Sequence, residues 1–194
     1  SGEPAVPDEV STRPVWKVHP DWTWGTLQPL MVRVAKTIAV VHAEGIIHLD
    51  VKLQNVVVKR SGKVKLIDFS FSREVGEKAP TRSELTASPG YAAPELVALA
   101  GGLTSDIVLS TKADVFSFGT ILAVATGGAN ELRNHSRRRL FSMTVRGERF
   151  SLSENQQTCP PQVRNIIQSC WTQNPASRPS IEKVIEMLEA CSSA

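Results

Sequence analysis

Residues 45–55 of the chain read Gly-Ile-Ile-His-Leu-Asp-Val-Lys-Leu-Gln-Asn. Four polar side chains, those of His48, Asp50, Lys52 and Asn55, follow an apolar run within a few positions of one another. One explanation is a loop of hydrogen-bonded turn residues, since Asp and Asn favour turns. The other is a site that positions charged groups for chemistry, and the remaining sequence decides between the two.

The composition is that of one globular domain. The chain has 194 residues, of which 41% are hydrophobic and 21% are charged, a profile that excludes a disordered or fibrous protein. Its 22 basic and 19 acidic residues give a formal charge of +3. That balance is too even to indicate nucleic acid as a partner.

Cysteine usage and targeting signals indicate a reducing compartment. Cys159, Cys170 and Cys191 are odd in number and lack CxxC spacing, which argues against a disulfide framework or a zinc site. The N-terminal residues do not have the order of a signal peptide, and no apolar run approaches the ~20 residues that a membrane span needs. We therefore expect a cytoplasmic or nuclear protein without a membrane span.

Hydrophobic periodicity predicts a mainly helical chain with one short hairpin. The prolines of residues 1–21 predict an irregular lead-in. Apolar residues at three- and four-residue intervals predict an amphipathic helix over 27–41 that is capped by Gly45. Residues 56–58 and 63–67, separated by a turn, predict a β-hairpin. The opening stretch would therefore lie on a loop between this helix and this hairpin.

The downstream part of the chain is predicted to consist mainly of helices. Residues 114–126 are apolar on nearly every face and are closed by two glycines, which predicts a helix buried within the domain. Apolar spacing predicts another helix around residues 163–170. A last helix is predicted over 181–188, with Ser180 as its N-cap.

Further motifs follow the opening stretch in a fixed order. They are Asp68-Phe69-Ser70 after the hairpin, Ala93-Pro94-Glu95, Asp114 at the start of the buried helix, and Arg178-Pro179 before the last helix. In this order the motifs resemble those of the eukaryotic protein kinases, specifically of their larger C-terminal lobe. The resemblance extends from about residue 22 to 190, and segments 88–95, 114–119 and 170–179 are similar to the tyrosine-kinase-like group.

The resemblance implies a mainly α fold, the protein-kinase-like large (C-terminal) lobe, over residues 22–194. This lobe is helical with a short β-hairpin at the catalytic loop, which would be residues 48–55, and its activation segment would be residues 68–95. A complete kinase also has a small β-rich N-terminal lobe with a Gly-rich loop and a strand lysine, and neither motif occurs before Leu27. The small lobe is therefore expected to be absent from this chain.

The resemblance gives each polar residue of the site a role in phosphoryl transfer. Asp50 would accept the proton of the substrate hydroxyl as the catalytic base. Lys52 would place its cation near the transferring γ-phosphate of ATP, in a catalytic and cofactor-binding role. Asn55 and Asp68 would bind Mg²⁺ and, with it, the nucleotide.

Other motif residues are expected to hold this site in place. His48 would pack and hydrogen-bond near Phe69, and Ser88 would bridge the catalytic aspartate and lysine. Glu95 and Arg178 would form a buried ion pair between the activation segment and the last helices, with two unrelated surface charges as the alternative. The residues with structural roles are therefore His48, Phe69, Ser88, Glu95, Asp114 and Arg178.

Two positions depart from the family pattern. Leu49 stands where most members have an arginine that binds a phosphorylated activation loop, so loop phosphorylation should matter less here. Ser70 replaces the glycine that normally follows Asp-Phe. If that backbone needs a positive φ, serine costs on the order of 1 kcal/mol and biases the orientation of Asp68.

Two functions are open at this point. The first is a serine/threonine protein kinase, because Lys52 matches the sequence pattern of that class. It would act on a protein substrate once an N-lobe is supplied by a missing segment or by another chain. Alone, the chain should bind Mg·ATP poorly and be inactive or very weak. The second is a kinase-derived scaffold that binds proteins without turnover, which the missing lobe and Ser70 favour.

A basic run follows the buried helix. It consists of Arg133, His135, Arg137, Arg138 and Arg139, with Arg146 and Arg149 close behind. One interpretation is a surface that recruits an acidic peptide or another anionic partner, on the substrate side of the lobe by family analogy. The alternative is an ordinary solvated loop.

Overall fold

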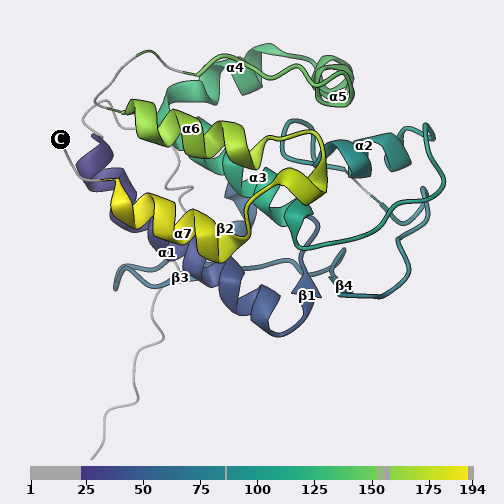
Figure 1. The fold of residues 1–194 in the computed structure, drawn as a ribbon, viewed down its shortest axis with the longest axis horizontal. Helices are drawn as coiled ribbons and strands as arrows, with labels where there is room; N and C mark the ends of the chain where they lie inside the picture. The colour runs from purple at the N-terminus through teal and green to yellow at the C-terminus, as the bar shows by residue number, and fades with distance from the viewer. Residues whose placement is uncertain (1–22, 86, 153, 155–157, 192–194) are drawn as a thin grey trace, which may run out of the picture.

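The computed structural model describes residues 23–85, 87–152, 154 and 158–191, and it is mainly helical with two small sheets (Figure 1). The lead-in predicted for residues 1–21 lies outside the described residues. The α-helices are α1 (Trp24–Ala43), α2 (Pro94–Ala100), α3 (Lys112–Ala123), α4 (Ala129–Asn134), α5 (Arg137–Val145), α6 (Pro161–Cys170) and α7 (Ile181–Ala190). Single helical turns are η1 (Leu53–Asn55), η2 (Val124–Gly128) and η3 (Pro175–Ser177). Within the described ranges, no helix has the length and apolar character needed to cross a membrane.

The hairpin prediction is confirmed, with the first strand as predicted and the second one residue shorter at each end. Strands β2 (Val56–Val58) and β3 (Val64–Leu66) pair antiparallel, and their turn closes where the Lys59 N–H donates to the Lys63 carbonyl at 2.9 Å. A second antiparallel pair, β1 (Ile46–Ile47) with β4 (Arg73–Glu74), was not predicted. It ties the start of the opening stretch to the chain beyond the hairpin.

Helix α1 begins earlier than the apolar spacing indicated. Its first turn is closed at Thr23, where the Thr23 N–H donates to Thr26 Oγ1 at 3.2 Å and the Thr26 hydroxyl donates back to the Thr23 carbonyl at 2.9 Å. The helix ends at Ala43, and Gly45 then takes a φ of +71° that glycine adopts without strain. The predicted end near Gly45 is therefore confirmed.

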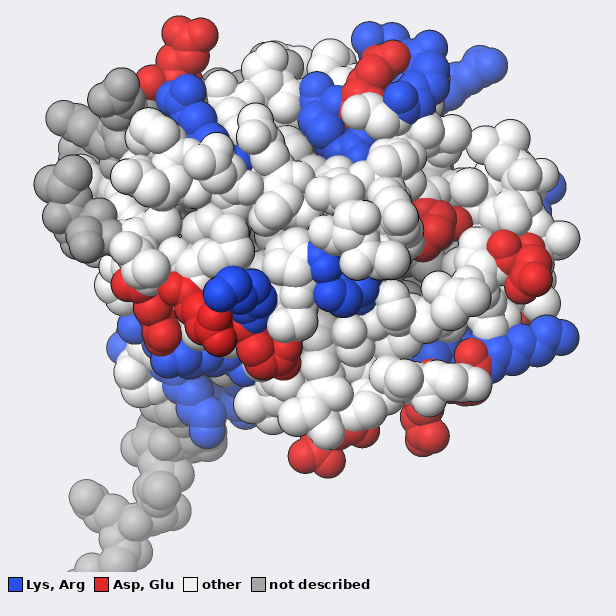
Figure 2. All heavy atoms as spheres, in the orientation of Figure 1, with Lys and Arg blue, Asp and Glu red and all other residues white. Residues whose placement is uncertain are grey.

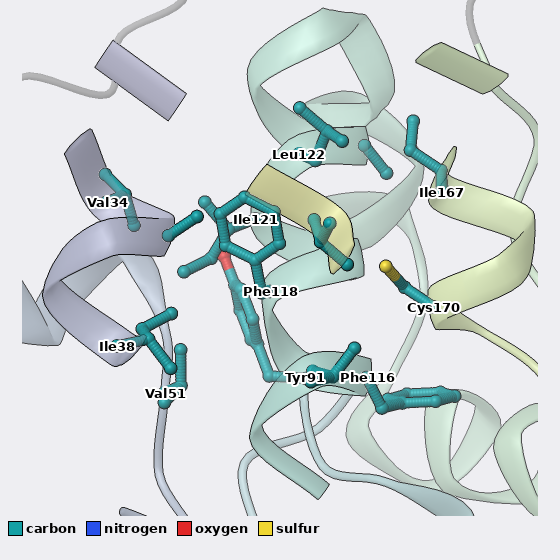
Figure 3. Packing of buried hydrophobic residues seen from close by; sticks show 14 of the residues in the cluster. Val34, Ile38, Val51, Tyr91, Phe116, Phe118, Ile121, Leu122, Ile167 and Cys170 are labelled. Atoms are coloured by element: carbon teal, nitrogen blue, oxygen red, sulfur yellow. The ribbon is translucent and has the colours of Figure 1, made fainter. Parts of the chain in front are cut away.

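Helix α3 lies at the centre of the core, between α1 and α6. Figure 3 shows Phe118 of α3 between Val34 of α1 and the side of α6 that carries Ile167. The backbones of α3 and α6 approach closely, since a Cβ placed on Gly119 would lie only 2.7 Å from the Cβ of Cys170. Glycine at this position lets the two helices pack in direct contact.

The predicted limits of the buried helix, residues 114–126, need correction at both ends. Helix α3 starts at Lys112 and stops at Ala123, and the wider turn η2 continues the chain to Gly128. There the Thr126 hydroxyl donates to the Leu122 carbonyl at 2.8 Å, and Gly127 takes a φ of +115°. Side-chain bonding to a carbonyl four residues back competes with regular helix, which apolar periodicity does not reveal.

The last two predicted helices are confirmed as α6 and α7. The Ser180 hydroxyl accepts from the Lys183 N–H at 3.2 Å and so caps α7 as expected. Helices α7 and α1 pack side by side (Figure 1). Gln28 joins them, because its Nε2 donates to the Leu188 and Cys191 carbonyls, each at 2.8 Å.

Arg178 joins the start of α2 to the chain between α6 and α7. Its guanidinium makes a two-pronged contact with Glu95, with Nη1 to Oε1 at 2.8 Å and Nη2 to Oε2 at 2.7 Å. The same group donates to the carbonyls of Thr172, Lys112 and Gln173 at 2.8–3.1 Å, and Arg178 is only 2% exposed. The predicted ion pair is therefore present and buried, and the alternative of unrelated surface charges is wrong.

Glu95→Gln should destabilise the domain strongly. It leaves the buried Arg178 charge without its counter-ion, a change that costs about 3–5 kcal/mol. Urea unfolding followed by circular dichroism measures the loss. The matched control is Glu189→Gln, which breaks the exposed Lys36–Glu189 pair of 2.7 Å and should cost about 1 kcal/mol or less. Equal losses in the two variants would contradict the role given to Arg178.

Candidate active site

The Asp50 carboxylate is held by three donors. Lys52 Nζ lies 2.5 Å and Asn55 Nδ2 lies 3.0 Å from Oδ2, while the Ser88 hydroxyl donates to Oδ1 at 2.7 Å. Asp50 is only 3% exposed, so these bonds act in a poorly solvated place and fix the orientation of the carboxylate. Lys52 Nζ also donates to Ser88 Oγ at 3.3 Å. Ser88 therefore bridges Asp50 and Lys52, as expected.

The backbone before Asp50 is braced by Asp114, in the first turn of α3. Asp114 Oδ2 accepts from the His48 N–H at 2.8 Å, and Oδ1 accepts from the Leu49 N–H at 2.9 Å. Leu49 takes a φ of +63°, a left-handed conformation that disfavours a side chain by roughly 1–2 kcal/mol. The two bonds to a buried carboxylate hold that conformation. The leucine side chain, which replaces the family's arginine, lies in the hydrophobic core.

His48 has the packing role predicted for it. Its ring lies 4.7 Å from that of Phe69, centroid to centroid. The Asp50 N–H donates to Nδ1 at 3.3 Å, so Nε2 carries the hydrogen and donates to the Ile67 carbonyl at 3.0 Å. His48 thereby connects the loop of Asp50 to the segment that carries Asp68.

Asp68 is exposed, and Ser70 fixes its carboxylate. The Ser70 hydroxyl donates to Asp68 Oδ1 at 2.6 Å. This bond is the main cause that lowers the pKa of Asp68 below its ordinary value, with the Ser70 backbone N–H and the charge of Lys52 adding to it. The anionic form is therefore favoured at the place where the family motif would bind a cation.

The conditional expectation of backbone strain at Ser70 is not met. In the part of the chain that the structure describes, the non-glycine residues with positive φ are Leu49 and Asp68, both at +63°. The left-handed residue of the Asp-Phe-Ser motif is its aspartate. Ser70 therefore acts through its hydroxyl group and not through strain of its own backbone.

Asn55 and Asp68 are suited to a hard cation that arrives with a phosphate. Asn55 Nδ2 donates to the carbonyl and the carboxylate of Asp50, at 2.9 and 3.0 Å, which leaves its Oδ1 as the atom able to bind a cation. The described residues contain no cluster of three or more His, Cys, Asp or Glu side chains that would bind a metal by themselves. Mg²⁺ commonly binds one or two protein oxygens and completes its coordination shell with phosphates and water. The two oxygen ligands offered by Asn55 and Asp68 match that pattern.

The motif residues thus fall into two groups. Asp50, Lys52, Asn55 and Ser88 make one hydrogen-bonded cluster, and Asp68 lies on the neighbouring segment joined to it through His48. Glu95 and Arg178 form the separate structural pair described above. Sequence reasoning missed His42, whose Nε2 lies 3.0 Å from Asp114 Oδ2, because no spacing signal links residues that far apart in the chain.

Comparison with known proteins gives a consistent family. The family model described as the protein kinase domain matches residues 17–188. The RGS domain-containing serine/threonine-protein kinase A of Dictyostelium discoideum is 28% identical over 157 residues, which cover 81% of this chain and 13% of that protein. A probable serine/threonine-protein kinase of the same organism is 31% identical over 160 residues, 82% of this chain and 11% of that protein. Serine/threonine-protein kinase PAK 4 of Mus musculus is 26% identical over 153 residues, 79% of this chain and 24% of that protein. The chain thus spans a quarter or less of the length of these relatives.

Ser70→Ala should raise the pKa of Asp68 toward its ordinary value, because the hydroxyl that stabilises the anion is lost. A ¹³C NMR titration of the Asp68 carboxyl measures the change. Ser72→Ala is the matched control, since the Ser72 hydroxyl donates to the Phe69 carbonyl at 2.8 Å and not to Asp68. An unchanged Asp68 pKa in Ser70→Ala would show that the hydroxyl contact does not stabilise the anion in solution.

Proposed function

Because the chain belongs to the eukaryotic protein kinase family, we propose that it is the C-terminal lobe of a serine/threonine protein kinase. With a small N-terminal lobe in place, it transfers the γ-phosphate of ATP to a serine or threonine of a protein substrate. The observation that carries this proposal is the Asp50 carboxylate, held by donors from Lys52, Asn55 and Ser88. A scaffold has no chemical need for that arrangement.

Asp50 is arranged to accept one more hydrogen bond. A carboxylate offers about four lone-pair positions, and the three donors around Asp50 use three of them. The remaining position suits the hydroxyl of a substrate serine or threonine. Asp50 then orients that hydroxyl for attack and takes its proton as the new bond to phosphorus forms.

Lys52 is arranged to serve the phosphate at the same time. An ammonium group has three N–H donors, and two of them reach Asp50 Oδ2 and Ser88 Oγ. The third is left for an oxygen of the transferring phosphoryl group, whose developing charge the lysine stabilises. The base and the cation are thus held at a fixed distance before any substrate binds, which reduces the reorganisation needed for reaction.

ATP and Mg²⁺ are the cofactors that fit this site. Asn55, through Oδ1, and Asp68, through its carboxylate, would hold the metal, which when bound neutralises charge on the phosphates. Asp68 is exposed and its pKa lies below the ordinary value, so the group is anionic at neutral pH, as this role requires.

The surface around Asp68 supports a small lobe as a partner. Ile67 and Phe69, on either side of Asp68, are 42% and 41% exposed, although apolar side chains of this size are usually buried. A partner that covered them would also cover the far side of the nucleotide. We infer that the small lobe comes from a segment of the same protein or from another chain.

Three relatives in the family support serine or threonine as the acceptor, since each is named a serine/threonine-protein kinase. Lys52 follows the same pattern. We further infer a cytoplasmic or nuclear location. Its support is that Cys159, Cys170 and Cys191 are unpaired and buried, as expected of a protein in a reducing compartment.

A protein-binding scaffold without turnover is the second candidate. The observation that favours it is the contact of 2.6 Å between Ser70 Oγ and Asp68 Oδ1, which occupies an oxygen that a metal would use. Under this reading, the chain keeps the kinase surface for binding proteins and lacks productive metal binding.

Asp50→Asn should remove most of the activity of the chain completed by a compatible small lobe. The variant keeps the size of the side chain but loses its charge and cannot accept the proton, a loss of roughly 10²- to 10⁴-fold in rate. Affinity for Mg·ATP should barely change. Initial rates on a serine peptide, a threonine peptide and a tyrosine peptide test both the base and the choice of acceptor. Undiminished turnover would rule out Asp50 as the base, and an unmodified chain without turnover would favour the scaffold.

Asp68→Asn should act differently, weakening Mg-dependent nucleotide affinity together with turnover. Calorimetry with Mg·ATP measures the affinity of the completed protein, and Asp50→Asn serves as the matched Asp-to-Asn control. The chain alone should bind Mg·ATP weakly, because the phosphates stay open to water on one side. Micromolar affinity of the chain alone, abolished by Asp68→Asn, would contradict the need for a second lobe.

A further inference from the structure

Positive charge is concentrated in one stretch of the chain. Residues 133–149 hold six arginines against one glutamate, a net charge of +5, although the whole chain carries only +3. The other residues together are therefore net negative. Figure 2 shows positively charged side chains (blue) gathered over α5. We call this patch the α5 basic surface; its members, all exposed, are Arg133, Arg137, Arg138, Arg139 and Arg146.

The charges of this surface oppose the stability of their own helix. Arg137, Arg138 and Arg139 occupy the first turn of α5, which contains no acidic residue. The N-terminus of a helix carries partial positive charge, so cations there are unfavourable. Such a departure from a local rule of helix stability is typical of a functional surface.

Only part of this charge is neutralised within the molecule. Glu148 Oε1 lies 3.0 Å from Arg146 Nε, and Glu148 Oε2 lies 3.8 Å from Arg139 Nη2. Arg137 and Arg138 form no ion pair with any other residue that the structure describes. Two exposed guanidinium groups are thus available to an anionic partner.

The α5 basic surface borders the segment that holds Asp50. Ser88, bonded to Asp50, lies two residues before Gly90, at most about 7 Å away. Gly90 packs against Leu132 of α4 and Leu140 of α5, since a Cβ placed on it would lie 2.2 and 3.7 Å from their Cδ1 atoms. Arg137–Arg139 directly precede Leu140.

Arg133 reaches the same segment from α4. Burial raises the pKa of Tyr91, and the nearby charge of Arg133 acts in the opposite direction. The arginines of both helices therefore flank residues 88–91. The first turn of α5 lies on the order of 15–20 Å from Asp50, a distance that an extended peptide covers in roughly five residues.

We propose that the α5 basic surface binds acidic residues of the protein substrate, about five positions from the serine or threonine that reaches Asp50. This specificity rests on the proposed kinase function. A peptide is favoured over nucleic acid or a lipid surface because the α5 basic surface is small and lies next to residues 88–91, the segment that contacts Asp50. Glu148 within it would repel a continuous anionic surface, whereas separate carboxylates can pair with the guanidinium groups around it.

Peptide binding to the chain tests the surface without needing turnover. The probes are three labelled serine peptides that carry glutamate, glutamine or lysine about five positions from the serine. Their binding is measured by fluorescence anisotropy. The glutamate peptide should bind most tightly, and Arg137→Glu/Arg138→Glu should weaken it by roughly 5- to 30-fold. The same variant should bind the lysine peptide more tightly than the unmodified chain does. Its Tm should not fall, because acidic residues suit the first turn of a helix.

The matched control is Arg60→Glu/Lys65→Glu, with the same change in net charge at exposed positions of the β2–β3 hairpin. It should leave all three affinities unchanged. Equal losses in both double variants would overturn the proposal, as would equal binding of the three peptides. Tighter binding to phosphatidylserine vesicles or single-stranded RNA than to the glutamate peptide, lost in Arg137→Glu/Arg138→Glu, would assign the surface to that partner instead and overturn the proposal.

Turnover by the completed protein separates this proposal from the kinase function. For the glutamate peptide, Arg137→Glu/Arg138→Glu should raise KM and leave kcat unchanged. Equal turnover of the glutamate, glutamine and lysine peptides would overturn the proposed role of the α5 basic surface and leave the kinase function standing. If the glutamate peptide binds and Arg137→Glu/Arg138→Glu weakens that binding, but the completed protein shows no turnover, the proposed surface stands and the kinase function is rejected.

Discussion

The candidate site depends on one buried carboxylate, that of Asp114. It lies in the first turn of the best-buried helix and accepts hydrogen bonds from the His48 and Leu49 backbones. Leu49 is thereby held in a left-handed conformation, and the direction of the chain into Asp50 follows from it. The loop that carries Asp50 is thus anchored to the core of the domain and not to its own surface contacts. This explains how a short loop can hold a carboxylate, an ammonium group and an amide in fixed relative positions.

Features set by local sequence could be predicted. Apolar periodicity located α1, α6 and α7, and a turn between two β-branched runs located the β2–β3 hairpin, because such patterns reflect contacts made by each element along its own length. The cluster of Asp50, Lys52, Asn55 and Ser88 was predicted from the order of family motifs, and the structure brings these side chains together. Their catalytic roles remain predictions.

Features set by distant contacts or by single backbone angles could not be predicted. Strands β1 and β4 are two residues each and form only through their mutual pairing. The contact of His42 with Asp114 joins residues far apart in the chain. The effect of Ser70 was sought in its backbone, but the positive φ belongs to Asp68, and the serine acts through its hydroxyl. In each case the deciding quantity is a spatial relation that composition and periodicity do not encode.

The close approach of α3 and α6 at Gly119 has a consequence for thiol chemistry. Burial raises the pKa of the Cys170 thiol to about 12, so the reactive thiolate is a minor form at neutral pH. The sulfur is also shielded by the core, and an alkylating reagent reaches it only after α6 separates from α3. The rate at which Cys170 is labelled therefore reports how often the centre of the domain opens. Labelling of Cys170 would thus measure local opening of the native state, which is otherwise followed by amide hydrogen exchange.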